Sequence, residues 1–243
     1  MGWTFTADEF AHVWRESGQD RMPFPLRVLE SPTTEQDAAR LRAGLSRRLP
    51  GGDPDLAACL RILAEPHARV VLVGGAHTPG SEIRLIACAV YDHAVLAVQE
   101  PGNRPDYGGT VRLSIGHTAG IGARVTACLP DTPPGREPAR EAATDAVRDE
   151  ETVLATHPAV PRIQRLLRRP HTAEGHIRIE TGLDRAVPNP PVHYSWIDVA
   201  NDGRYLLRAG ETVHVVPAST GQLAAQLQRR LVPAHSSHSR RSG

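Results

Sequence analysis

Hydrophobic and polar positions follow two different periods along the chain, and the change of period separates helical from strand segments. Residues 3–6 alternate like a short strand. Thr6 and Glu9 then form a capping box, which predicts a helix with one apolar face made by Phe10, Val13 and Trp14. A proline-rich extended segment at 22–28 follows this helix.

Two further helices are predicted before residue 67. The first helix is predicted to start at the capping pair Thr33 and Gln36. Its apolar positions, at helical spacing, are Ala38, Leu41, Leu45 and Leu49. The second begins at Pro54 and ends before Pro66, because proline suits the first turn of a helix and breaks a later one.

From residue 70 onward the pattern indicates short strands rich in Val, Ile and Leu. Clusters of Gly, Pro, Asn and Asp separate them, which favours antiparallel hairpins, and the four expected strands are 70–73, 83–91, 94–99 and 110–115. A helix at 121–129, a proline-rich loop at 130–138 and a mostly polar helix at 139–154 are expected next.

The second half of the chain then repeats the first. At a shift of 104 positions, residues 54–67 match residues 158–171 with identities at Pro54/Pro158, Arg61/Arg165, Leu63/Leu167, Pro66/Pro170 and His67/His171. Four strands and a helix follow in the same order, at 177–180, 193–199, 204–208, 212–216 and 222–231. This agreement in element order predicts an internal duplication.

The duplication predicts two half-domains, each a helix, four strands and a helix, that share one core around a pseudo-two-fold axis. A single mixed sheet flanked by helices is the simplest architecture from the residues alone. We expect one domain over 1–232, with an N-terminal half at about 1–135, a C-terminal half at about 150–232 and a disordered polar tail at 233–243.

Composition excludes several classes of function. All 28 basic residues are arginine, so a Walker A lysine, a pyridoxal Schiff base and Tyr-Lys or Ser-Lys catalytic pairs are absent. A formal net charge of +1 gives no general attraction to nucleic acid or to an anionic membrane. Cys59, Cys88 and Cys128 form no close pair, which indicates a reduced cytoplasmic protein with thiols buried in its core.

One glycine-rich segment invites an enzymatic interpretation. Gly116-His-Thr-Ala-Gly-Ile-Gly122 follows a strand and precedes a helix, like the phosphate-binding turn of a nicotinamide-dependent reductase. The chain lacks the next parallel strand and the catalytic lysine of that class, so a strand-to-helix turn is favoured and the reductase stays the alternative. Similarly, residues 74–80 are expected to form a hairpin loop.

Other polar patterns give no catalytic or metal site. Arg162, Arg165 and Arg169 are expected on a solvated helix face, and His235 and His238 lie on the tail without a third ligand. The segment 196–206 predicts a hairpin in which Asp198 and Arg204 bridge two strands, and Trp196 pairs with Tyr205.

Several short motifs follow one another in order over residues 3–232. They are Phe5-Thr-Ala-Asp-Glu-Phe10 with Pro23-Phe-Pro-Leu-Arg27, Asp53-Pro-Asp-Leu56 with 60–66, and Asp198 with Gly203-Arg-Tyr205 and Val215-Val-Pro217. In this order and spacing they resemble the EspG family, the secretion-associated chaperones of actinobacterial type VII (ESX) secretion systems. The lysine-free composition suits a high-GC actinobacterium.

The resemblance implies an α+β fold with a mostly antiparallel sheet, helical bundles at its sides and two pseudo-two-fold halves. It implies a cytoplasmic chaperone without enzymatic activity or cofactor, which binds a PE/PPE-like heterodimer or another type VII substrate, and neither nucleic acid nor membrane. It places the partner-binding residues at Gly75, His77, Thr78, Pro79, Trp196, Asp198, Arg204, Tyr205, Gln226 and Arg230.

Overall fold

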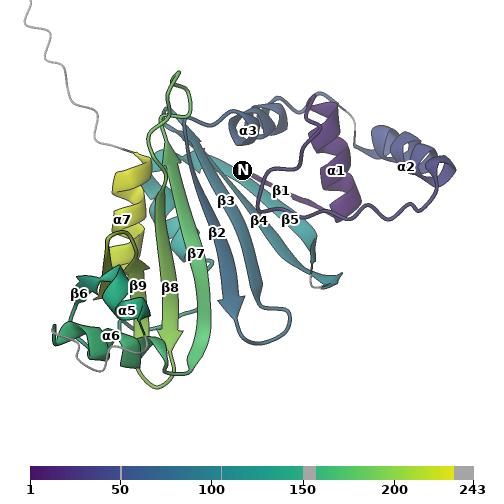
Figure 1. Cartoon of the computed structure of the whole chain (residues 1–243). Coiled ribbons are helices and arrows are strands. Elements are labelled where there is room, and N and C mark those ends of the chain that lie inside the picture. The colour runs from purple at the N-terminus through teal and green to yellow at the C-terminus, as the bar shows by residue number, and fades with distance from the viewer. Residues whose placement is uncertain (50, 105, 150–156, 233–243) are drawn as a thin grey trace, which may run out of the picture.

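A computed structural model of the chain describes all residues except 50, 105, 150–156 and 233–243 (Figure 1). The strands are β1 (Gly2–Phe5), β2 (Ala68–Ala76), β3 (Glu82–Val90), β4 (His93–Arg104), β5 (Tyr107–His117), β6 (Arg140–Ala143), β7 (His171–Thr181), β8 (Val192–Val199), β9 (Gly203–Arg208) and β10 (Thr212–Pro217). The helices are α1 (Ala7–Glu16), α2 (Glu35–Arg48), α3 (Pro54–Ala64), η1 (Thr118–Gly120), α4 (Ile121–Thr126), α5 (Thr144–Arg148), α6 (Ala159–Leu167) and α7 (Thr220–Leu231).

All ten strands form one sheet in the order β1-β5-β4-β3-β2-β7-β8-β9-β10-β6. Strands β2 and β7 pair at its centre, with Leu72 opposite Ile177, and on either side of them the order repeats outward. Helix α3 precedes β2 as α6 precedes β7, and α4 follows β5 as α7 follows β10. The predicted repeat of element order is therefore present, and residues 70–73 and 177–180 lie in equivalent central strands.

Every pair of neighbouring strands is antiparallel. The mixed sheet expected from the residues alone is wrong, whereas the mostly antiparallel sheet implied by the family resemblance is confirmed. Short turns explain this, because a parallel pair needs a long crossover and most strands within each half are joined directly.

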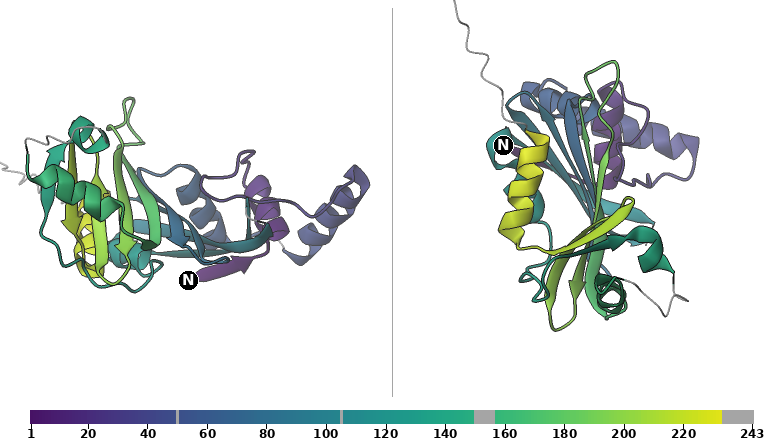
Figure 2. Two further views of the ribbon diagram at one scale, coloured as in Figure 1. Left: turned by 60° about the horizontal axis from the view of Figure 1, so that its bottom comes forward. Right: turned by 60° about the vertical axis from the view of Figure 1, so that its left-hand side comes forward.

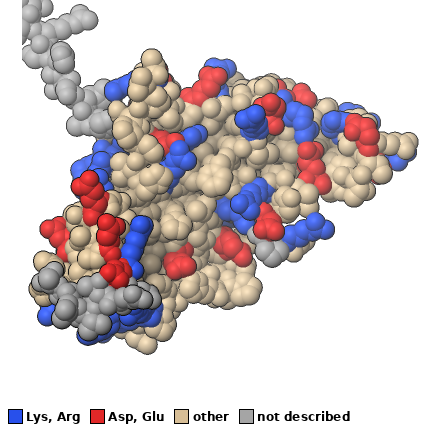
Figure 3. Space-filling view, in the orientation of Figure 1, with Lys and Arg blue, Asp and Glu red and all other residues tan. Residues whose placement is uncertain are grey.

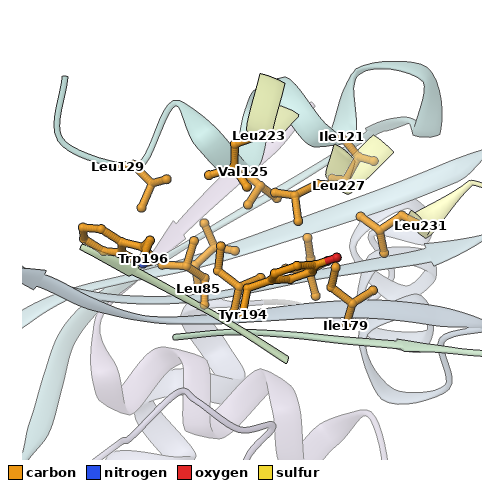
Figure 4. Packing of buried hydrophobic residues seen from close by; sticks show 14 of the residues in the cluster. Leu85, Ile121, Val125, Leu129, Ile179, Tyr194, Trp196, Leu223, Leu227 and Leu231 are labelled. Carbon is orange, nitrogen blue, oxygen red and sulfur yellow. The ribbon is translucent and has the colours of Figure 1, made fainter. Parts of the chain in front are cut away.

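One face of the sheet is covered by α4 and α7. Their leucine, isoleucine and valine side chains point toward Leu85, Ile179, Tyr194 and Trp196 of the sheet (Figure 4). This cluster takes residues from both halves, so it is the shared core that the duplication predicts.

The opposite face carries two separate helical layers. Side chains alternate along a strand, so Val71 and Ile197 lie on the face opposite to their neighbours Leu72 and Trp196. Helices α1 and α3 pack there against the N-terminal half, and α6 packs against the C-terminal half. The two layers lie toward opposite ends of the sheet (Figure 2).

Local signals gave most element boundaries. The capping box of Thr6 and Glu9 begins α1, and Pro54 begins α3 with Asp53 as its cap. Helix α2 begins one residue later than expected, since the side chain of Thr34, not Thr33, accepts the hydrogen bond of the Asp37 amide.

The expected helix at 139–154 is wrong in its first turn and present only as a short helix after it. Residues Arg140–Ala143 form the edge strand β6, which pairs with β10 so that Ala142 lies opposite Val213. A short helix, α5, follows at Thr144–Arg148, and 150–156 lie outside the described residues. Only one side chain of β6, that of Ala142, is buried. The hydrogen bonds to β10 therefore determine the extended conformation of this segment.

Thiol labelling tests the packing of the core. Cys59 and Cys88 are fully buried, and burial raises the pKa of both thiols to about 12. We expect neither to react with a thiol reagent in the native protein, while Cys128, half-buried, reacts slowly. All three should react in denaturant. Rapid native labelling of Cys88, found by mass spectrometry, would contradict the packing of β3 against α3.

Candidate protein-docking surface

The middle of one sheet face is uncovered. Strand β7 lies at the centre of the sheet, yet Thr172, Glu174, His176 and Arg178 are all exposed because they point into the gap between α3 and α6. Figure 3 views this face, and uncharged side chains predominate in its middle. No helix described in the structure covers this side of the central strand, so the surface is accessible to another molecule.

This uncovered area forms a shallow hollow of about 360 Å³. Phe24 stands at its edge, and 58% of its surface is exposed, which is unusual for phenylalanine. We call the area the open face and define it by Val71, Val73, His176, Arg178, His193, Ser195 and Leu207, with Phe24 at its edge. Apolar and polar side chains are mixed on it, as they are on many protein interfaces.

An ion-pair network borders the open face. Glu180 accepts hydrogen bonds from Arg69 on β2 and from Arg178, at 2.6 Å, on its own strand. Burial alone would raise the pKa of Glu180, but the hydrogen bond and charge of Arg69, with help from Arg178, outweigh it and hold the pKa below its ordinary value. The network fixes Arg178 in place at the surface.

The lowered pKa predicts a loss of stability in acid. Glu180 stabilises the fold fully above its unfolded pKa, ordinarily 4.5, and this contribution disappears as the pH falls through the lower folded value. The free energy of unfolding, measured by denaturant titration, should therefore fall more steeply below pH 4.5 in the wild type than in Glu180→Gln. Equal slopes would show that Glu180 contributes nothing.

The loop between β2 and β3 extends the open face. His77, Thr78 and Pro79 are exposed, as expected for partner-binding residues. The Nε2 atom of His77 lies 3.8 Å from Oε1 of Glu174, whose side chain points to the same side of β7 as His176. The loop and the open face therefore form one continuous surface.

Gly75 has a different role from the expected one. It is buried within β2 with a φ of +147°, and a Cβ atom there would lie 2.2 Å from the carbonyl oxygen of Ser81. The residue therefore shapes the hairpin backbone, because only glycine fits, and a partner cannot contact it.

Four more of the expected contact residues are buried. Trp196, Asp198, Arg204 and Tyr205 are at most 1% exposed, so a partner cannot reach them while the sheet is intact. Asp198 and Arg204 bridge β8 and β9 as predicted, with two hydrogen bonds of 2.7 Å inside the core. The expected pairing of Trp196 with Tyr205 is wrong, because the register places Trp196 opposite Leu206 and the two aromatic rings lie in cores on opposite faces.

These buried residues hold the segment that connects the two halves. The amide of Arg204 donates to the carbonyl of Pro133, and its guanidinium donates to the carbonyl of Pro130, at 2.7 and 2.8 Å. Tyr205 accepts a hydrogen bond from the amide of Glu137 at 2.9 Å. The hairpin motif is thus a structural element that joins the halves.

The two expected residues of α7 lie elsewhere. Gln226 is half-buried and donates a hydrogen bond of 2.8 Å to the hydroxyl of Tyr194, and Arg230 is exposed near the start of β2. His77 follows the end of β2, so about nine residues at 3.3 Å each, roughly 30 Å, separate it from that region. The structure does not bring the α7 residues and the loop together.

The glycine-rich turn at 116–122 joins β5 to α4, as expected. The amide of Gly122 donates to Oε1 of Gln228 at 3.1 Å, and Nε2 of Gln228 donates to the carbonyl of Thr118 at 2.8 Å. Gly122 therefore serves the packing of α4 against α7. The amide of Gly122 is therefore not free to bind a phosphate, as the reductase alternative would need.

The remaining polar candidates give no further site. Arg162 and Arg165 are exposed on α6, while Arg169 lies beyond its end and pairs with Asp202 and Glu137. Within the described ranges, no three His, Cys, Asp or Glu side chains are placed to hold a metal ion. His235 and His238 fall outside those ranges. The helices described in the structure include none long and apolar enough to cross a membrane.

The fold and surface define a two-half α+β scaffold with a wide, shallow face suited to docking another protein. The match of residues 6–229 to the EspG family model shows that this chain belongs to the EspG family. A search of curated proteins finds no match.

Among solved structures, the chain is similar to EspG5, a type VII secretion system chaperone of Mycobacterium tuberculosis, solved in complex with the PE25–PPE41 dimer. The TM-score is 0.64 at 15% sequence identity, and the likeness covers 96% of this chain and 98% of EspG5. At this identity the comparison shows a shared fold.

Proposed function

We propose that this protein is a cytoplasmic chaperone of a type VII (ESX) secretion system, without enzymatic activity. It binds the apolar helical tip of a PE/PPE-type substrate, keeps that substrate soluble and escorts it to the secretion machinery. The observation that carries the proposal is the uncovered centre of the sheet, a surface that the fold leaves open beside an exposed loop.

Physical chemistry supports a binding role for this surface. An exposed apolar helical tip is liable to aggregate, and a standard interface of roughly 800 Å² on each partner would cover it reversibly. Such a contact needs a wide, shallow surface rather than an enclosed pocket. The open face has this shape and combines Phe24, Val73 and Leu207 with polar side chains.

The open face and the loop His77–Ser81 are the proposed client site. Phe24 would pack on the apolar tip, because exposed aromatic side chains are the usual anchors of interfaces. Arg178 and His193, which lie opposite each other on β7 and β8, would supply polar contacts at the rim. Residues Gln226 and Arg230 of α7 lie outside this site.

Co-expression tests the function. A PE/PPE-like pair from the same genome, produced with and without this chain, should be soluble in its presence and aggregated in its absence. The three proteins should also elute together in size-exclusion chromatography. A pair that stays equally insoluble with the chain, and never elutes with it, would refute the chaperone function for that client class.

A further inference from the structure

A second hollow, of about 550 Å³, lies at the other end of the strands from the loop His77–Ser81. It forms where the end of α7 meets the loop between β7 and β8 and the turn between β3 and β4. We call it the arginine hollow and define it by His67, Tyr91, Thr181, Arg185, Arg229 and Arg230.

Positive charge exceeds negative charge there. Asp184 is the one carboxylate among the lining residues, against Arg185, Arg229 and Arg230. In the part of the chain that the structure describes, no ion pair joins any of these three arginines to a carboxylate. Arginines elsewhere, such as Arg15 and Arg69, each contact a glutamate. The hollow therefore attracts an anionic group.

The rim of the hollow is held in a fixed shape. The amide of Leu183 donates to the carbonyl of His67 at 3.0 Å, which ties the β7–β8 loop to the start of β2. Asn189 closes the loop through its amide and its side chain, both of which donate to Thr181. A ligand would thus bind without first having to order this loop.

Tyr91 gives the hollow an aromatic wall. Its side chain is 76% exposed, and its φ of +51° lies in the left-handed region, where a bulky residue is uncommon. The edge of one ring meets the face of the other where Tyr91 packs against His67, with 4.8 Å between ring centroids. The turn therefore presents an aromatic ring beside the arginines.

We propose that the arginine hollow docks an acidic segment of a partner protein, whose carboxylates bind the guanidinium groups and whose apolar side chains contact Tyr91. Guanidinium and carboxylate groups match in geometry and can form two parallel hydrogen bonds. Residues 233–243 of the chain do not supply such a segment, because they contain Arg240 and Arg241 and no Asp or Glu side chain. This site is separate from the open face and does not depend on the chaperone proposal.

Fluorescence anisotropy tests the site with a labelled peptide of alternating glutamate and leucine. The wild type should bind it, and the variant Arg185→Gln/Arg229→Gln/Arg230→Gln should bind about tenfold more weakly or worse at an unchanged melting temperature. The control Arg162→Gln/Arg165→Gln removes two exposed arginines of α6 and should keep wild-type affinity. Affinity should also fall as salt is added.

Four results would overturn the proposal. The first is that the wild type does not bind the peptide. The second is that the α6 control loses as much affinity as the triple variant, which would indicate a general attraction of the peptide to basic proteins. The third is stronger binding to vesicles containing phosphatidylglycerol, abolished by the same triple variant, which would assign the hollow to a membrane surface. A peptide of alternating glutamine and leucine that binds equally well would also exclude recognition of carboxylates.

Discussion

Replacing Arg204 by methionine should lower the melting temperature by about 6–20 °C. The substitution leaves Asp198 buried without its partner, and removing one member of a buried ion pair costs about 3–5 kcal/mol. For a chain of this size, each kcal/mol corresponds to about 2–4 °C. The connection between the halves would also lose the hydrogen bond from Arg204 to Pro130.

Two further variants separate the buried pair from a general effect of lost charge. Arg15→Met removes an exposed ion pair with Glu30 and should change stability by less than about 1 kcal/mol. Asp198→Asn/Arg204→Met removes both charges and should be more stable than Arg204→Met alone. Similar melting temperatures for Arg204→Met and Arg15→Met would contradict the structural role of the hairpin motif.

Gly122→Val should give the second large effect. A Cβ atom at Gly122 would lie 2.2 Å from the carbonyl oxygen of Ala224, so α4 and α7 would have to move apart. Overpacking of this kind costs about 1–3 kcal/mol, and the obstacle here is backbone of the facing helix. We expect a melting temperature lower by about 2–12 °C, measured by circular dichroism.

Gly120→Val is the matched control, since a Cβ atom at Gly120 meets no atom within 4 Å. Gly120 belongs to the same turn, and the variant should have a melting temperature close to that of the wild type. If Gly120→Val were the more harmful change, the close helix contact would not be the reason for glycine in this turn.

Local signals in the sequence were sufficient for much of the fold. The capping box of Thr6 and Glu9, the proline at position 54 and the antiparallel hairpins depend on residues close together in the chain. The internal repeat supplied the long-range information, because two equivalent halves must meet at equivalent strands. The edge strand β6 gave no such signal, since it is specified mainly by its hydrogen bonds to β10.

The site was harder to predict, because exposure depends on which helices cover which part of the sheet. Trp196 and His176 both lie on central strands, yet one is fully buried under α4 and α7 and the other faces solvent. The alternation in 171–178 of polar and apolar residues was the available signal for the open face. The alternation shows that one side of β7 is polar. It does not show that the helices leave this side uncovered.

The location of the client site is the most specific part of the proposed chaperone function. The client should bind the open face and the neighbouring loop, rather than the exposed side of α7. Phe24→Asp/His193→Glu changes two exposed side chains on the open face, and Gln226→Glu/Arg230→Glu changes the two candidate residues of α7. In Gln226→Glu, the hydrogen bond between residue 226 and Tyr194 can be kept, because the tyrosine hydroxyl can donate to the glutamate carboxylate.

A co-expression pull-down with a tagged PE/PPE-like pair, with melting temperatures of the same variants, tests this claim most directly. We expect both variants to fold. The α7 variant should be recovered with the tagged client at the wild-type level, whereas the open-face variant should not be recovered with it. Recovery of the folded open-face variant at the wild-type level, or loss of the α7 variant alone, would contradict it.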